Sequence, residues 1–429
     1  MTERRALNEL TARQIVELTS SGAVTAEAVV RACLARIEAR EPQVRAWTHL
    51  DPDHAIAQAR EVDRRSALGA LRGVPVAIKD IIATVDQPTS YGSPIYAGHR
   101  PPWDAACVSA IRAAGGIVIG KSVTTEFAAS FPGKTVHPRD PSRTPGGSSS
   151  GSAAAVADCM VPVGVGTQTG GSVLRPASFC GVVGYKPSFG WVSRHGVKPL
   201  SESLDTVGSF GRTVADAARL AAVMAARPAL LELPAAASPR IAVWRGKSLA
   251  KAEPDMLACL ERTASTLSKH GAMVADLTPP AIFEELDAAH HEIEHFEMVQ
   301  SLSFEMRMHR HQLSPVLRGR VEGGQACSVE SYDASWRVAW ECRAAMASIW
   351  ANVDAILTPS APGEAPVGHA STGNALFNRM WTLLQGPAIS VPANVGSNGM
   401  PLGSQFVGAP EHDVRTLAIA QWAERLPLA

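Results

Sequence analysis

The chain has 429 residues, of which 46% are apolar and 19% charged, as in globular proteins and not in disordered ones. Its 40 basic residues balance 40 acidic residues, so charge gives no reason to expect binding to nucleic acid or to an anionic membrane. Seven widely spread cysteines without a Cys-x-x-Cys pair argue against a disulfide framework and a zinc ribbon. A charged N-terminus and the lack of long apolar runs predict a cytoplasmic protein without a membrane span.

The elements expected along the chain alternate between helices and strands. Residues 11–66 are predicted to form two or three helices, one of which ends at Pro42. Short β-branched runs follow at 73–82, 115–122 and 161–169, separated by Ala-rich helical segments. Later strands are expected at 240–246, 353–360, 388–395 and 401–410, with a long helical region over 279–350. This alternation favours an α/β fold with a mainly parallel or mixed sheet covered by helices on both faces.

The chain is interpreted as a single domain over residues 1–429. The one candidate linker, the Ala- and Pro-rich segment 227–240, is flanked on both sides by the same pattern of strands and helices. Within the domain, we expect residues 66–215 to hold the catalytic core and residues 227–350 to form a more variable helical lobe.

Two Gly-Gly-Ser loops are the first candidate site. The loop TPGGSSSGSAAA, residues 144–155, contains Gly147-Ser148-Ser149-Ser150-Gly151, which matches the Gly-x-Ser-x-Gly elbow of α/β-hydrolases. That elbow also needs a downstream acid and histidine, and no histidine stands in a suitable setting. A phosphate-binding loop would need a following Gly-Lys-Ser/Thr, which is absent. Taken alone, the loop is equally well explained as a tight turn before the Ala-rich helix.

Lys79 and the second loop favour a catalytic role. Lys79 ends an apolar strand, where desolvation lowers the pKa of an amine and lets it act as a base. A Lys–Ser–Ser relay would carry a proton from an attacking serine to that amine without a histidine. In TQTGGS, residues 167–172, the glycines let backbone N–H groups converge on an oxyanion, which would seat Ser172 as the nucleophile.

These motifs together resemble the amidase signature family. The resemblance runs through RGVPVAIKDII, TPGGSSSGSAAAVA, TGGS and the segment 177–218, and it continues more weakly to the C-terminus. It implies a sheet of about eleven strands inside helices, Lys79 as general base, Ser148 as relay serine in a cis peptide, and Ser172 as the acyl-forming nucleophile. The backbone amides of Thr169, Gly170 and Gly171 would form the oxyanion hole. No cofactor and no metal are implied.

The resemblance also gives expectations for the substrate pocket and for partners. Ser149, Phe127, Phe131 and Met298 are predicted to contact substrate, although core packing explains the last three equally well. The expected partners are a small-molecule amide and, by analogy with the family, a second copy of the chain, with no nucleic acid and no membrane.

Two positions depart from the family pattern Thr-Asp-Thr-Gly-Gly-Ser-Ile-Arg. Gln168 replaces the aspartate, and Leu174 stands at the position of the arginine, while Arg175 lies one residue further on. Losing both members of a charged pair leaves no unpaired buried charge. We interpret the change as a consistent variant, with a differently supported nucleophile loop.

The predicted function is hydrolysis of a small-molecule amide, urea or hydrazide through an acyl-enzyme. Two alternatives remain: the glutaminase subunit of a tRNA-dependent amidotransferase, which normally keeps the altered pair, and a non-catalytic partner-binding homologue, which the intact triad disfavours. A His-Glu-x-x-His match at His291 and His295 is typical of zinc proteases. No third ligand is evident, so it is interpreted as an ordinary helix face.

Overall fold

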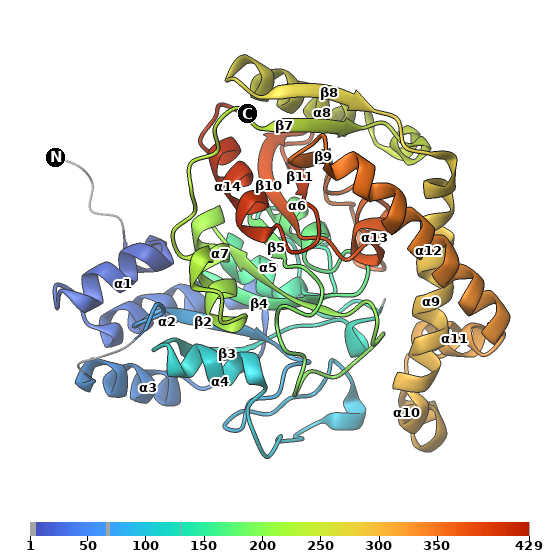
Figure 1. Cartoon of the computed structure of the whole chain (residues 1–429). Coiled ribbons are helices and arrows are strands. Elements are labelled where there is room, and N and C mark those ends of the chain that lie inside the picture. The colour runs from blue at the N-terminus through green and yellow to red at the C-terminus, as the bar shows by residue number, and fades with distance from the viewer. Residues whose placement is uncertain (1–5, 66–68, 130, 429) are drawn as a thin grey trace.

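A twisted sheet of eleven strands runs through the part of the chain that the structure describes, residues 6–65, 69–129 and 131–428 of a computed structural model (Figure 1). The strand order is β1-β3-β2-β4-β6-β5-β10-β11-β9-β7-β8. The strands are β1 Trp47–Leu50, β2 Pro75–Lys79, β3 Ile117–Ser122, β4 Val163–Gln168, β5 Val183–Lys186, β6 Thr206–Gly211, β7 Arg240–Trp244, β8 Met273–Leu277, β9 Ala355–Pro359, β10 Ala388–Val395 and β11 Pro401–Val407. This confirms the predicted α/β fold with one large mixed sheet.

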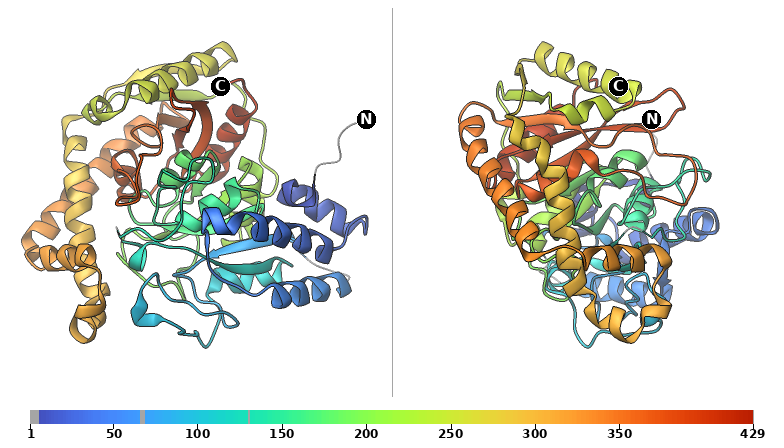
Figure 2. Two further views of the ribbon diagram at one scale, coloured as in Figure 1. Left: turned by 180° about the vertical axis from the view of Figure 1, so that it is seen from behind. Right: turned by 90° about the vertical axis from the view of Figure 1, so that its right-hand side faces the viewer.

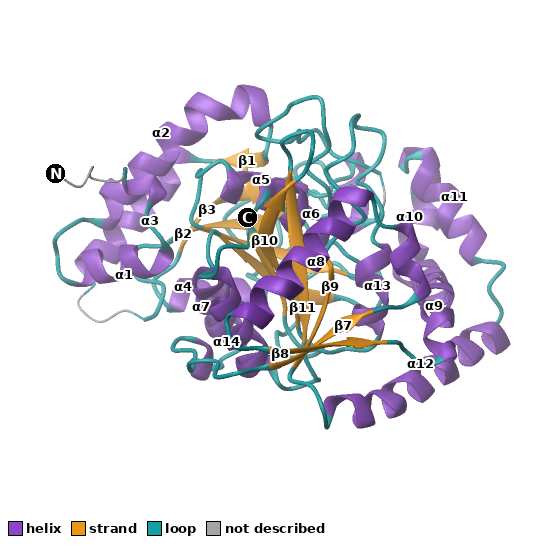
Figure 3. Cartoon of the chain, turned by 90° about the horizontal axis from the view of Figure 1, so that it is seen from above, coloured by secondary structure: helices purple, strands orange, loops and turns teal. Residues whose placement is uncertain are grey.

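Helices cover both faces of this sheet (Figure 3). They are α1 Ala12–Ser20, α2 Ala26–Val44, α3 Pro52–Arg64, α4 Ala106–Ala113, α5 Ser150–Ala157, α6 Leu174–Cys180, α7 Val214–Met224, α8 Pro254–Lys269, α9 Leu286–Ser301, α10 Ser303–Met308, α11 Pro315–Gly324, α12 Val329–Trp350, α13 Leu376–Leu383 and α14 Asp413–Glu424. Near β2 and β4, helices α5 and α6 pack in one apolar cluster with α2 and α3, and α1, α4 and α7 contribute to another. None of the described helices is long and apolar enough to cross a membrane.

The pairing of the central strands brings the two predicted loops together. Strand β2 runs parallel to both β3 and β4, and β4 also pairs antiparallel with β6. The carboxyl ends of parallel neighbours lie at the same edge of a sheet. Lys79 at the end of β2 therefore lies beside the end of β4, where the TQTGGS loop begins.

Helices α9 to α12 form an arm along one side of the sheet (Figure 2). Helix α9 packs against α11, α12 and α13, and its apolar residues join a cluster that includes strands β7 and β9. The arm falls within the predicted helical lobe, but the division of the chain at 66–215 and 227–350 stays a prediction. Residues 66–68 lie outside the described part of the chain.

Several elements differ from the sequence expectation. Helix α2 continues past Pro42 to Val44, because the buried Val44 side chain packs in the core and the proline removes only one hydrogen bond in the last turn. Strands β1, β5, β6 and β8 were not expected. β5 and β6 are short and contain glycines, so long-range pairing with β4 and β10 and not local propensity makes them strands.

Candidate active site

Lys79 lies at the centre of the candidate site with no exposed surface. Its Nζ lies 2.7 Å from Ser148 Oγ and 2.8 Å from Thr167 Oγ1. No ion pair among the described residues involves this amine, although the more distant Asp205 favours its charged form. Burial is the larger influence and holds the pKa of Lys79 well below its ordinary value. The amine is therefore prepared to accept a proton from a hydroxyl.

Ser148 sits on a tightly packed turn. The Gly147–Ser148 peptide is cis, and the Ser148 carbonyl accepts a hydrogen bond of 3.1 Å from the Thr125 N–H. A Cβ on Gly147 would come within 2.7 Å of the Thr372 side chain, so only glycine fits there. The turn fixes the Ser148 hydroxyl against Lys79.

Ser172 lies directly against this relay loop. The Ser149 N–H donates to the Ser172 carbonyl at 3.4 Å, which joins the two Gly-Gly-Ser loops. The Ser172 side chain borders a cavity and keeps 8% of its surface exposed, unlike the fully buried Lys79. The structure thus brings together Lys79, Ser148 and Ser172, and only the last is accessible to a substrate.

The carbonyls of the TGGS turn are held from outside. Thr169 O accepts from His290 Nε2 at 2.9 Å, Gly170 O from Thr382 Oγ1 at 2.8 Å, and Gly171 O from the Arg175 N–H at 3.0 Å. A carbonyl and the next N–H point in opposite directions across a planar trans peptide. The amides of this turn have no acceptor among the described residues, and the turn borders the cavity, so its predicted role as an oxyanion hole stays a prediction that this arrangement allows.

Gln168 supports the nucleophile loop without a charge. Its side-chain oxygen accepts from the N–H groups of Val173 at 2.9 Å and Leu174 at 3.1 Å, at the start of α6. Its Nε2 donates to Thr382 Oγ1 at 3.0 Å. Leu174 is buried in an apolar cluster, so the pair that replaces the family's Asp and Arg is a polar brace plus an apolar side chain.

Arg175 ties the two loops to each other. Its Nη2 donates to Gly147 O at 2.6 Å and to Thr372 Oγ1 at 3.1 Å, and its Nη1 donates to Gly373 O at 3.0 Å. Burial lowers the pKa of Arg175 to about 9. In the sequence, Arg175 stands out only because it lies one residue beyond the position of the family's arginine. Its role as a tether was not predicted, because its partners lie on loops far along the chain.

Asp205 is a further residue that the sequence did not single out. Its Oδ1 accepts from Thr169 Oγ1 at 2.5 Å, and its other oxygen accepts from the N–H groups of Leu200 and Ser201. Burial raises the pKa of Asp205 to about 6 despite these hydrogen bonds. It holds Thr169, the first residue of the TGGS turn.

The cavity beside Ser172 has a volume of about 160 Å³. It is lined by Ala128, Ala129, Thr169, Gly170, Gly171, Ser172, Arg175, His291, Glu294, Arg320, Ser371, Thr372, Gly373, Ala375 and Arg379. The lining thus holds three arginines and one glutamate; Glu294 pairs with Arg320 at 3.2 Å, and Arg379 pairs with Asp287 at 2.7 Å. A small substrate that carries negative charge suits this lining. A larger hollow of about 960 Å³ between α2 and α3 contains none of the triad.

The predicted substrate contacts lie outside this lining. Phe127 and Met298 are buried in one apolar cluster, while Phe131 is 43% exposed. Ser149 is buried, and its hydroxyl donates to Thr167 O at 3.2 Å, which braces strand β4. A role for these four residues in binding substrate stays a prediction. The structure instead places charged residues from α9, α11 and α13 around the nucleophile.

A family model described as Amidase matches residues 28–417. The chain belongs to the amidase family. Such enzymes hydrolyse carbon–nitrogen bonds other than peptide bonds, so this amidase is an enzyme of that class, as predicted. Over 479 aligned residues it is 34% identical to a protein of Chloroflexus aurantiacus that is named as one subunit of the glutamyl-tRNA(Gln) amidotransferase, with 99% of this chain and 98% of the relative covered.

Solved structures give the same assignment. One, described as a vestigial protein complex that reveals the origins of an s-triazine catabolic enzyme, superposes with a TM-score of 0.90 at 27% identity and covers 96% of this chain and 97% of the other. The corresponding glutamyl-tRNA(Gln) amidotransferase subunit from Thermotoga maritima superposes with a TM-score of 0.81 at 28% identity, covering 96% and 94%. The amidase fold is thereby confirmed over nearly the whole chain.

The same comparisons correct the prediction about partners. That prediction named a small-molecule amide and a second copy of the chain. It is wrong, because the similar proteins are named as one subunit of an amidotransferase or are described as part of a protein complex. Similarity of this kind points to a different protein as the partner.

Proposed function

We propose that this amidase is the amide-hydrolysing subunit of a complex and that it releases ammonia from the side-chain amide of glutamine through an acyl-enzyme on Ser172. The observation that carries the chemistry is the contact of 2.7 Å between the buried Lys79 amine and Ser148 Oγ. A neutral amine paired with a hydroxyl, with no ionised carboxylate bonded to it, is a base and not a structural charge.

In this mechanism, Ser172 attacks the amide carbonyl while its proton passes through Ser148 to Lys79. The N–H groups of the TGGS turn hold the oxyanion, and their carbonyls are already anchored, so little reorganisation is required. Lys79 then returns the proton by way of Ser148 to the departing amine. Water enters, gives its proton to the same relay, and releases the carboxylic acid from Ser172.

Two observations support glutamine as the substrate. The cavity of about 160 Å³ suits a small molecule, and the guanidinium groups of Arg320 and Arg379 in its lining suit a carboxylate. Relatives that cover nearly the whole chain carry the name of the glutamyl-tRNA(Gln) amidotransferase. A protein partner then receives the ammonia or stabilises this amidase.

In the sequence alone, the replacement of the family's Asp and Arg by Gln168 and Leu174 argues against this function. The contacts of the two residues in the structure weaken that argument. Gln168 accepts two backbone hydrogen bonds at the start of α6 and so gives the nucleophile loop a polar support. Leu174 is packed in the core and leaves no charge unpaired.

A second candidate is the hydrolysis of another small, negatively charged amide in a complex with a partner protein. The structural likeness to the complex of the s-triazine catabolic enzyme, at a TM-score of 0.90, favours it. The same triad and the same charged cavity serve both candidates, which differ only in the amide that fits.

Ammonia release from a panel of amides separates these functions. We expect turnover of L-glutamine, little turnover of its methyl ester, in which the carboxylate is masked, and none by the Ser172→Ala variant. Faster turnover of another carboxylate-bearing amide would favour the second candidate. Equal turnover of neutral amides would contradict the role of the arginines, and an active Ser172→Ala enzyme would contradict the mechanism.

A further inference from the structure

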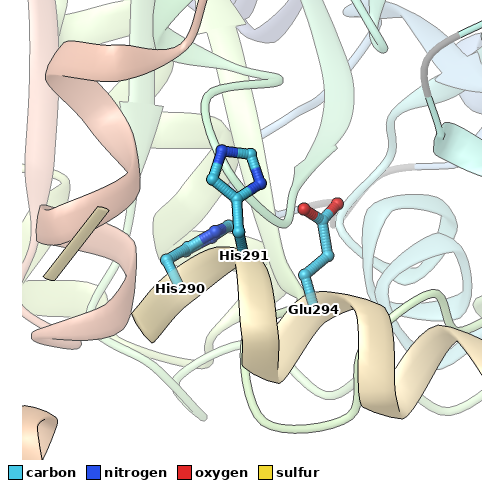
Figure 4. Close-up of side chains that lie close together, drawn as sticks. All are labelled: His290, His291 and Glu294. Atoms are coloured by element: carbon cyan, nitrogen blue, oxygen red, sulfur yellow. The ribbon is translucent and has the colours of Figure 1, made fainter. Parts of the chain in front are cut away.

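Three side chains of helix α9 cluster beside the nucleophile, and none of them belongs to the proposed proton relay. They are His290, His291 and Glu294, and one ligand atom of each lies within 4.8 Å of the others. His291 and Glu294 line the cavity that contains Ser172. Figure 4 shows the Glu294 carboxylate facing the His291 ring on the same side of α9. Two imidazoles and a carboxylate form a common ligand set for transition metals.

His290 provides an independent indication of a ligand. Its Nε2 lies 2.9 Å from Thr169 O, and a carbonyl only accepts, so Nε2 carries the hydrogen. The other nitrogen, Nδ1, is then a lone-pair atom. It is buried and has no hydrogen-bond partner in the described structure. A histidine that donates one N–H to a carbonyl and presents its other nitrogen is oriented as metal-binding histidines are.

We propose that His290, His291 and Glu294 bind a divalent transition-metal ion, Zn²⁺ in the first instance, and that the bound ion blocks the cavity at Ser172. The trio leaves an open coordination position, as sets of two histidines and one glutamate do. Bond lengths of about 2.0–2.2 Å require the flexible Glu294 side chain to move roughly an ångström toward the histidines. Because the trio lies outside the hydrolytic relay, the ion is an inhibitor and not a cofactor.

The positive residues around the trio set the strength of this site. Arg320 pairs with Glu294 through one carboxylate oxygen at 3.2 Å, and Arg379 also borders the cavity. Both guanidinium groups repel a cation. Binding is therefore weaker than at a structural zinc site and reversible by a chelator.

The zinc-protease pattern in the sequence points to a different pair, His291 and His295. In the structure His295 Nε2 lies 3.4 Å from the Arg320 guanidinium, and His295 is not part of the cluster whose ligand atoms lie within 4.8 Å of one another. The glutamate of the zinc-protease motif, Glu292, contacts Ser331 and does not line the cavity. The geometry thus favours His290 and Glu294 as the companions of His291.

Titration of the purified full-length chain with ZnCl₂, followed by calorimetry, tests the site without any substrate. We expect one equivalent of bound Zn²⁺, a d–d absorption band with Co²⁺, and no binding of Mg²⁺, which prefers oxygen ligands. His291→Ala and the isosteric Glu294→Gln should each weaken Zn²⁺ binding by about 10-fold or more. His295→Ala is the matched control and should bind as the wild type does. Circular dichroism confirms that each variant is folded.

The same ion should inhibit amide hydrolysis by the wild type, and EDTA should restore it. The absence of saturable Zn²⁺ binding, unchanged affinity in Glu294→Gln, or loss of binding in His295→Ala would overturn the proposal. Because calorimetry reads binding directly, this outcome is distinct from a failure of the proposed amidase function.

Discussion

At the scale of single residues, the environment of Lys79 decides what the site can do. A fully buried amine is normally stabilised by a carboxylate, as Lys121 is by Asp80 at 3.5 Å. Lys79 instead has two hydroxyls, Ser148 and Thr167, within 2.8 Å. Hydroxyls carry no charge that would offset that of an ammonium group, and burial is the larger influence, so desolvation favours the neutral amine.

Removal of the base or the nucleophile should abolish turnover. We expect Lys79→Ala and Ser172→Ala each to lower kcat by about 10³-fold or more, because residues that act as a unit fail together. Steady-state ammonia release measures this, with the exposed Lys134→Ala as a control that retains wild-type kcat. A Lys79→Ala enzyme within about 10-fold of wild type would show that another group is the base.

The pH profile should report the same amine. Lys79 must be neutral to accept a proton, and it is protonated below its pKa, so kcat/KM should rise from pH 6 toward alkaline pH and then level off. The midpoint should lie below the ordinary lysine value of about 10.4. Measuring kcat at saturating substrate and kcat/KM at low substrate separates the titration of Lys79 from the titration of the substrate. A profile that falls toward alkaline pH would contradict the assignment.

Gln168 and Leu174 should behave as a coupled pair. Gln168→Asp alone places a carboxylate in a site with no exposed surface and no cation at position 174, so it should destabilise the fold by about 2 kcal/mol or more. Adding Leu174→Arg should recover part of that loss. Urea unfolding of the two single variants and the double variant gives the coupling free energy. Additive effects would show that the two positions do not interact.

At the scale of elements, the active site depends on how helix α6 is attached to its surroundings. The helix begins two residues after Ser172, and Arg175 in its first turn reaches Gly147 O and Gly373 O. The Arg175 side chain therefore holds the nucleophile loop, the relay loop and the rim of the cavity in fixed positions relative to one another. Such positioning affects the geometry of the transition state more than the binding of substrate.

Arg175→Met should accordingly lower kcat by about 10- to 100-fold with a smaller change in KM. Arg175→Lys should not restore it, because one ammonium group cannot replace the fork of guanidinium donors. Separate kcat and KM values, with thermal unfolding to show that the variants are folded, test this. Full activity in Arg175→Met would mean that the loops hold their positions without the tether.

At the scale of the whole molecule, three buried lysines lie along one sheet. Lys79, Lys121 and Lys186 are among the largest fully buried side chains of the described chain. Burial lowers the pKa of Lys121 and of Lys186 to about 8 in each case. The unfolded chain has ordinary lysines with pKa values of about 10.4.

This difference makes stability depend on pH in a defined window. Between about pH 8 and 10.4 these lysines bind more protons in the unfolded state than in the folded state, so they contribute to the free energy of unfolding a term that rises with pH, whereas buried thiols such as Cys33 and Cys180, whose pKa values burial raises, contribute a term that falls. Lys186→Met should reduce that slope by about 1.4 kcal/mol per pH unit. Urea unfolding of both proteins from pH 7.5 to 10 measures the difference. Parallel curves would show that Lys186 keeps its charge in the folded state.

The sequence predicted that Lys79 lies beside the Gly-Gly-Ser loops, as it does in the structure, while the catalytic roles of these residues stay predictions. β2, β3 and β4 are short apolar runs that end in polar residues, and parallel pairing brings their ends together. The TQTGGS loop follows the end of β4, whereas the TPGGSSSGS loop lies well beyond the end of β3 at Ser122 and directly precedes α5. The lining of the cavity was not predictable in the same way. Arg320 lies on α11 and Arg379 on α13, and the sequences of these two helices share no common motif. Only the packing of α9, α11 and α13 brings both arginines to the cavity at Ser172.

The residues that line the cavity and the residues of the triad come from different parts of the fold, which affects how the substrate of such an enzyme can change during evolution. His291, Arg320 and Arg379 come from peripheral helices, whereas the proton relay lies on strands and loops of the central sheet. Substitutions at these three positions should therefore change which amide is accepted more than they change bond cleavage. The substrate of such an enzyme can therefore change during evolution while its catalytic residues stay the same. A saturation library confined to these three positions is a short route to variants that accept amides of other sizes and charges.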